Sequence, residues 1–172
     1  MEKQTLLRFR GKWLFAAVIA VLLCSPAFAN TSATLILEGT VPGILDISVA
    51  AAAVSANLDL GSNASFVVAS VTERSNKRAG YTVTLSSENA VGAGSDVPFL
   101  KGQEVTNTDT LEYSLTYAGI PVELSAGSAI ITDVSTKTPS SGSVKPLGIS
   151  YVGDFLYEDV YSDTLTFTIA AK

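Results

Sequence analysis

Short runs in which apolar and polar residues alternate follow one another along most of the chain. In "YTVTLSS" (81–87), for example, Tyr81, Val83 and Leu85 fall on one face, and polar residues fall on the other. An alternation with a period of two predicts a half-buried β-strand. Runs of this kind occupy residues 34–41, 44–49, 57–61, 65–72, 81–87, 111–117, 120–124, 129–134, 147–152 and 164–169.

The breaks between these runs contain Gly, Pro, Ser and Asn, which are the residues that turns prefer. The two longest breaks, at 86–98 and 136–146, are expected to be loops. Apart from the N-terminal region, only "VAAAAVSA" (49–56) favours a helix, and eight residues make a marginal one. Many short strands without a long helix predict an all-β sandwich.

The N-terminal region has the pattern of a secretory signal peptide. A basic segment from Lys3 to Lys12 precedes an apolar run of twelve residues, and Ala27 and Ala29 supply the small residues before a cleavage site. We therefore expect residues 1–29 to be removed on export. The apolar run is shorter than the ~18 residues that indicate a membrane-spanning helix.

The composition excludes several classes of function. The exported chain of 143 residues keeps seven Lys and Arg against 15 Asp and Glu, because four basic residues and Glu2 lie in the leader. A net charge of −8 disfavours binding to nucleic acid. There is no His, and the single Cys also lies in the leader. Catalytic Ser-His and Cys-His pairs, Cys/His zinc sites and disulfides are therefore excluded, and we expect no enzyme activity and no cofactor.

Three stretches together resemble fimbrial subunits of the chaperone–usher kind. They are "YSDTLTFT" (161–168), "GYTVTLSSEN" (80–89) and "ATLILEGTVPGILDISV" (33–49). The likeness is closest to the archaic and alternate branches, which include spore coat protein U-like domains. Many such pilins carry a disulfide near their start, and this chain does not.

The resemblance implies an immunoglobulin-like β-sandwich that lacks one strand and is completed by a donor strand from a neighbouring subunit. Residues 30–42 would be the donor extension, and residues 43–172 the pilin-like domain. The donor face would carry Ala33, Leu35, Leu37 and Val41. The groove that receives it would be lined by Leu165, Phe167 and Ile169 of the last strand.

The function implied is that of a structural subunit of a surface pilus that supports adhesion or biofilm formation. Its partners would be copies of itself in a head-to-tail polymer, a periplasmic chaperone and an outer-membrane usher. The chain would pass through the periplasm to the surface of a Gram-negative bacterium.

Several alternatives stay open, and one is a coat or matrix protein that assembles by the same strand exchange without forming a thin fibre. Residues 34–41 can instead be the first strand of a self-contained sandwich. Such a monomeric secreted protein would bind carbohydrate through the aromatic residues of "YVGDFLYEDVYSD" (151–163). The carboxylates of the same stretch also suggest calcium, although their spacing fits no EF-hand loop.

Two further groups of polar residues attract attention. Arg74, Lys77 and Arg78 form a basic group that suits an anionic host glycan, and a solvated turn explains the same group without a ligand. Ser141, Ser143 and Lys145 have the composition of a Ser–Lys nucleophile. They are expected to lie in a loop, where a lysine stays too hydrated to act as a base.

Overall fold

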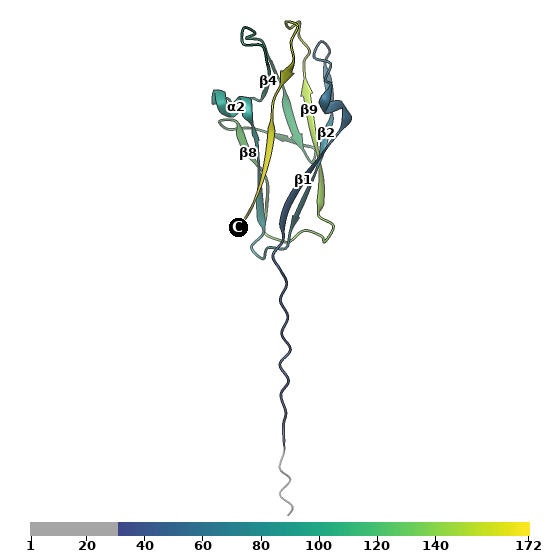
Figure 1. Ribbon diagram of the computed structural model, residues 1–172, viewed down its shortest axis with the longest axis vertical. Coiled ribbons are helices and arrows are strands. Elements are labelled where there is room, and N and C mark those ends of the chain that lie inside the picture. The colour runs from purple at the N-terminus through teal and green to yellow at the C-terminus, as the bar shows by residue number, and fades with distance from the viewer. Residues whose placement is uncertain (1–30) are drawn as a thin grey trace, which may run out of the picture. The chain divides into compact units, whose positions relative to one another are not determined.

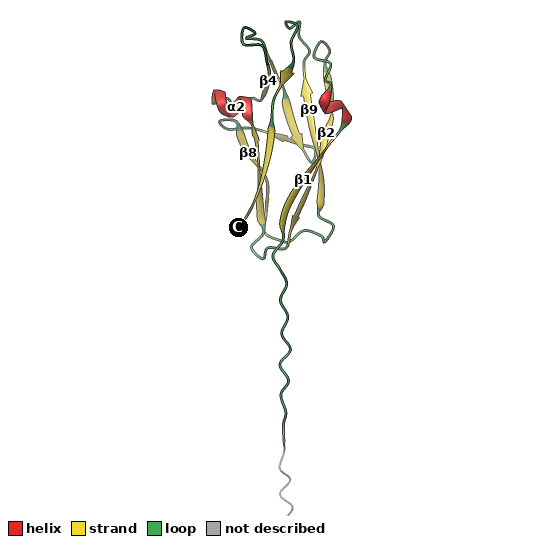
Figure 2. Ribbon diagram, viewed as in Figure 1, coloured by secondary structure: helices red, strands yellow, loops and turns green. Residues whose placement is uncertain are grey.

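The computed structural model describes residues 31–172, so the expected leader and Asn30 lie outside the described residues. Among the described residues, 31–40 and 41–172 belong to separate units. Residues 31–40 contain no helix, strand or turn, and all their side chains are exposed. The second unit is built almost entirely of strands (Figures 1 and 2).

The strands form three antiparallel sheets. The largest has the order β1-β2-β9-β6-β7, with bounds Leu45–Ala51, Ala64–Ser75, Ser143–Tyr151, Ser114–Tyr117 and Ile120–Val122. The second has the order β11-β3-β8, with bounds Leu165–Ala171, Tyr81–Ser87 and Ser128–Val134. The third has the order β10-β4-β5, with bounds Tyr161–Ser162, Phe99–Gly102 and Thr110–Glu112. The prediction of an all-β sandwich is confirmed.

The core lies between the sheets and follows the period of two. In β3, Tyr81, Val83 and Leu85 are buried, and the residues between them are partly exposed. Apolar residues of the other strands pack with them in one cluster, among them Val71, Leu111, Leu115, Leu147 and Ile149. The alternation therefore identified the buried face of the strand correctly.

Several local features differ from the predictions. The expected loop at 86–98 contains a short helix, α2 (Glu88–Ala93), drawn in red in Figure 2. Ser87 caps its first turn by accepting a hydrogen bond from the amide of Ala90, and Gly94 ends it in the left-handed conformation. The Ala-rich stretch is divided between the end of β1 and a 3-10 turn, η1 (Ala53–Ala56).

Two runs that alternate in sequence form no strand. Residues 57–61 are irregular and end in a turn at 60–61, and residues 34–41 have no assigned structure. A strand needs a hydrogen-bonded neighbour, and residues 34–41 have none within the single chain. Conversely, β4 was not predicted because four residues are too few to show a period.

One carboxylate is buried inside the sandwich. Glu73 of β2 is fully inaccessible, and four side chains donate hydrogen bonds to it at 2.6–2.8 Å. Tyr117 and Lys145 come from the same sheet as Glu73, and Tyr81 and Thr132 come from the opposite sheet. The network therefore bonds the two sheets to each other through the core.

The expectation that Ser143 and Lys145 lie in a loop is wrong. Ser143 and Lys145 lie in strand β9 and not in a loop, and the Lys145 ammonium pairs with Glu73. The Lys145 ammonium donates to the Glu73 carboxylate at 2.8 Å and to the Thr132 hydroxyl at 2.7 Å, and the structure gives it no hydrogen bond to Ser143.

The pH dependence of stability should reveal the Glu73 network. Burial raises the pKa of Glu73, but the hydrogen bonds from Lys145, Tyr117, Thr132 and Tyr81 outweigh it and hold the pKa below its ordinary value of 4.5. A carboxyl with a lowered pKa stabilises the fold above its unfolded value, and this stabilisation is lost as the pH falls through the folded value. The free energy of unfolding should therefore decrease below about pH 4.5.

Thermal unfolding between pH 7 and pH 2, with Glu73→Gln as control, measures this effect. Other carboxylates titrate equally in both proteins, so the difference between them isolates Glu73. We expect wild type to be the more stable protein at pH 7 and the difference to shrink in acid. A difference that does not change with pH contradicts the assignment.

Candidate functional site

Strands β1 and β11 are both edge strands. β1 pairs only with β2, from Leu45↔Ser75 to Ala51↔Ala69, and β11 pairs only with β3, from Leu165↔Ser87 to Ala171↔Tyr81. The two strands are neighbours in space, as the yellow strand beside β1 in Figure 1 shows, but no ladder joins them. Each therefore has a row of backbone N–H and C=O groups without a strand partner.

A cavity of about 740 Å³ opens between these two edges. Val49 and Ala51 of β1 line one wall, and Leu165 and Phe167 of β11 line the other. Deeper lining residues belong to the core and include Val68, Ala69, Leu100, Tyr113, Leu147 and Ile149. The sandwich is thus open to solvent at the side where these two edges face each other.

The apolar residues that line the walls of this cavity are partly exposed to solvent. Val49 of β1 is 49% exposed, whereas Val83 and Leu85 of β3, the strand that pairs with β11, are 0% exposed. The predicted groove residues Leu165, Phe167 and Ile169 are all only partly buried. Leu165 and Phe167 line the cavity, and Ile169 does not, so the cavity extends along the first part of β11.

The predicted donor residues lie in exposed backbone. Leu35, Leu37 and Val41 are 81%, 86% and 82% exposed, and Ala33 is exposed as well. Ile36, on the opposite face of the alternation, is exposed to the same degree at 83%. Neither face of the segment is buried within the single chain.

Asp163 fixes the beginning of β11. Its carboxylate accepts hydrogen bonds from the Ser87 hydroxyl at 2.6 Å, the Tyr113 hydroxyl at 2.5 Å and the Asn89 amide at 3.1 Å. Burial, followed by the bond to Asp163, raises the pKa of Tyr113 well above its usual range, so its hydroxyl remains a donor. The sequence motif around Tyr161 and Asp163 gave no hint of this role.

The far end of β11 is fixed as well. The amide of Lys172 donates to the carbonyl of Gly80 at 3.3 Å, and the Lys172 ammonium forms a salt bridge with Asp133. The strand that lines one wall of the cavity is therefore held at both ends.

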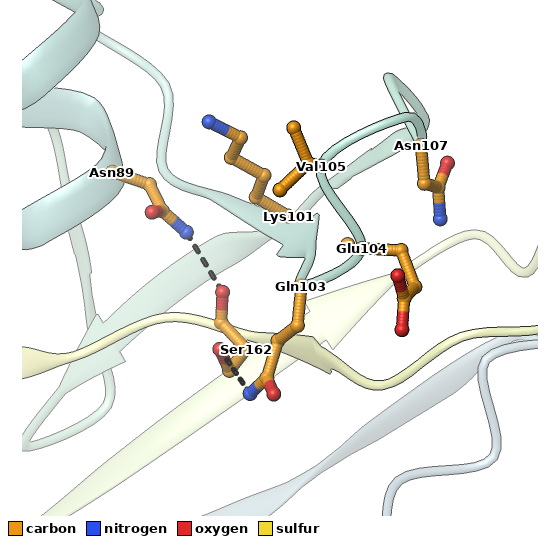
Figure 3. A pocket seen from close by; sticks show the side chains of 8 residues that line it. Asn89, Lys101, Gln103, Glu104, Val105, Asn107 and Ser162 are labelled. Atoms are coloured by element: carbon orange, nitrogen blue, oxygen red, sulfur yellow. Dashed lines mark hydrogen bonds between the residues drawn. The ribbon is translucent and has the colours of Figure 1, made fainter.

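A smaller hollow next to the start of β11 is polar (Figure 3). The side-chain amide of Asn89 donates to the carbonyl of Ser162 at 2.8 Å, and that of Gln103 donates to the Ser162 hydroxyl at 3.3 Å. These groups bond to one another across the hollow. They attach β10 to its surroundings.

The loop at 151–160 combines held and exposed residues. Asp159 accepts hydrogen bonds from the Glu104 amide and the Asn107 side chain, and the first of these is the main cause that lowers the pKa of Asp159. Phe155 and Tyr157 are exposed and line a hollow of about 640 Å³ with residues 57–61. Of the four aromatic residues expected to contact carbohydrate, Phe155 and Tyr157 are accessible, whereas Tyr151 is buried and Tyr161 is partly buried.

The three residues of the basic group differ in their surroundings. Arg74 is exposed and lies near the end of β2. Arg78 is exposed in the turn that follows. Lys77 is half-buried, and its ammonium would lie 2.8 Å from a Cβ added to Gly43. One member of the group is therefore packed against the segment before β1.

Among residues 31–172, no group of three or more His, Cys, Asp or Glu side chains is placed to hold a metal ion. No helix in the described part of the chain is long and apolar enough to cross a membrane. In comparisons with known proteins, no family model and no curated protein sequence matches the chain.

Removing the Asp163 carboxylate should loosen β11. Asp163→Ala leaves the hydroxyls of Ser87 and Tyr113 without their acceptor, and bonds to a charged group are worth ~1.5–3 kcal/mol each. Since Asp163 is only partly buried, we expect a loss of about 2–4 kcal/mol in the free energy of unfolding. Denaturant titration measures it.

Asp154→Ala is the matched control, because Asp154 is exposed and accepts only from the amide of the next residue, Phe155. It should change the unfolding free energy by less than about 0.5 kcal/mol. Equal losses in the two variants would show that Asp163 has no special role.

Proposed function

We propose that the protein is a structural subunit of a surface filament, assembled by insertion of one subunit's N-terminal segment into the next subunit. The observation that carries the proposal is the apolar cavity between two unpaired strand edges. A single extended segment would supply both a backbone partner for the free strand edges and apolar side chains for the cavity.

The donor segment has the matching pattern. On one face it presents Ala33, Leu35, Leu37 and Val41, and these side chains are exposed in the single chain. Burying the three larger ones is worth ~1.5–3 kcal/mol each, roughly 5–9 kcal/mol together. Backbone hydrogen bonds along the inserted strand add ~1 kcal/mol net apiece.

Insertion requires the groove to widen. Cα atoms of β1 and β11 approach within 8 Å of each other, whereas two strands that flank a third lie ~9.6 Å apart, which is twice the usual spacing. The walls must therefore separate by a few ångströms along part of their length. The unpaired edges make this separation inexpensive, because no ladder between β1 and β11 has to break.

The resulting contact is head-to-tail, since each subunit gives a segment and receives one at a different place. A contact of this type that does not close into a ring builds a filament. No catalytic group is needed. The resemblance of the sequence to chaperone–usher pilins supports an immunoglobulin-like fold, a periplasmic chaperone and an outer-membrane usher as partners, and a position on the surface of a Gram-negative cell.

A second candidate is a monomeric secreted protein that binds carbohydrate. The exposed rings of Phe155 and Tyr157 beside a hollow favour it, because aromatic faces stack on sugar rings. This candidate leaves the cavity between β1 and β11 without a purpose. Size measurement separates the two: the leader-free chain should form multimers that resist SDS if it is a filament subunit.

Charge on the donor face should prevent assembly. Leu35→Asp and Leu37→Asp place a carboxylate where the cavity is apolar, and an unpaired buried charge is highly unfavourable. We expect both purified, leader-free variants to fold but to lose SDS-resistant multimers, as measured by unheated gel electrophoresis and electron microscopy. Ile36→Asp is the matched control, because it adds the same charge to the opposite face and should leave assembly intact.

Moving residues 30–41 to the C-terminus through a short Gly/Ser linker provides an independent measurement. β11 ends at the C-terminus, so the attached segment can return along the groove and fill it. The product should be a soluble monomer. Normal fibres from Leu35→Asp and Leu37→Asp, or polymers from the rearranged chain, would contradict the proposal.

A further inference from the structure

Asn76 holds the chain just before β1. Its side-chain amide donates to the carbonyl of Pro42 at 2.8 Å and accepts from the amide of Ile44 at 2.6 Å. Its backbone amide donates to the carbonyl of Ile44 at 3.2 Å. The side-chain amide thus takes the place of a peptide group in a neighbouring strand and continues the β1 ladder back to Pro42.

Asn76 is itself held in place by its surroundings. The preceding residue, Ser75, is buried, and its backbone exchanges hydrogen bonds with Thr138 of the loop before β9. Lys77, the next residue, lies against Gly43. These contacts fix the position of Asn76 beside the residues that precede β1. We call Asn76, with its hydrogen bonds to Pro42 and Ile44, the clamp.

The clamped residues have the sequence of a tight turn. In "VPGI" (41–44), Pro and Gly occupy the two central positions that a type II β-turn prefers. That turn needs a positive φ at Gly43 and a hydrogen bond from the amide of Ile44 to the carbonyl of Val41. Gly43 is not among the glycines with positive φ, and the amide of Ile44 is bonded to Asn76 instead. The clamp and the turn compete for the same amide.

Such a turn would direct the N-terminal segment into the groove of its own chain. A chain that reverses at 41–44 runs back beside β1, and the only free edge of β1 faces the cavity. The start of β1 and the end of β11 lie at the same end of the sandwich. Leu45 pairs with Ser75 and Ala171 pairs with Tyr81, and Tyr81 is only six positions after Ser75 along the chain. The segment would then fill its own cavity, parallel to β11.

We propose that Asn76 is a positioning residue for assembly: by holding Pro42 and Ile44 it prevents the fold-back turn and leaves the segment free for another copy. This inference rests on the proposed function. In this proposal, the hydrogen bonds of Asn76 decide whether the N-terminal segment fills the cavity of its own chain or that of a neighbour. They also explain why residues 41–44 do not form the turn that their sequence favours.

The test compares Asn76→Ala with wild type after refolding of the leader-free chain at equal concentration. Size-exclusion chromatography and unheated gels measure the ratio of monomer to SDS-resistant multimer. Losing one or two net hydrogen bonds of the clamp should raise this ratio roughly tenfold. The extra monomer should not bind a synthetic peptide of residues 31–43, because its groove is already filled.

Two further variants separate the clamp from a general loss of stability. Ser140→Ala removes a hydroxyl from the same hollow, where Ser140 makes no side-chain hydrogen bond within residues 31–172, and it should behave as wild type. Adding Gly43→Ala to Asn76→Ala disfavours the positive φ of the turn and should restore the multimers. A side chain at Gly43 meets only the mobile end of Lys77.

An unchanged ratio in Asn76→Ala, or no restoration by the added Gly43→Ala, overturns the role of Asn76 while wild-type multimers still support the proposed function. If wild type itself stays monomeric and binds no peptide, the proposed function fails, and the inference fails with it.

Discussion

The organising constraint in this molecule is that the backbone edges of β1 and β11 face each other without a shared ladder. Backbone N–H and C=O groups are almost always paired when they leave water, and apolar side chains are most stable when covered. At this place the sandwich satisfies neither requirement, because Val49, Leu165 and Phe167 line an open cavity between the two edges. The opening is confined to the side of the sandwich where these two edges face each other.

The core around Glu73 is built in another way. Glu73 collects hydrogen bonds from side chains of both sheets, and among residues 31–172 no buried side-chain polar atom lacks a partner. A network of this kind requires defined positions of its donors, because a buried carboxylate that loses one is destabilised. It keeps the two sheets in one arrangement while the cavity between β1 and β11 remains open. The hydrogen-bonded network around Glu73 and the open cavity between β1 and β11 therefore occur in one small domain.

The sequence predicted the strands well because their pattern is local. Tyr81, Val83 and Leu85 identify a buried face without any knowledge of the partner strand. Features that depend on distant residues were not predictable in the same way. The pairing of β2 with β9 joins residues 70 to 87 positions apart, and the contact between Glu73 and Lys145 follows from it. The inward register of Val71, Glu73 and Ser75 contained a signal, since it places a charge on a core face. The role of Asn76 was not predicted, because in the sequence it lies among Arg74, Lys77 and Arg78, which were considered only for their charge.

The two walls of the cavity differ in how firmly they are attached. Asp163 ties the first residues of β11 to Ser87 and Tyr113, and Lys172 ties its last residues to Gly80 and Asp133. Strand β1 is held by its ladder with β2 and, at its beginning, by Asn76. If a neighbour's segment inserts as proposed, we expect β1 to be the wall that moves and the end of β1 near Asn76 to stay in place. Insertion would then leave β11, and with it the sheet that contains β3, unchanged.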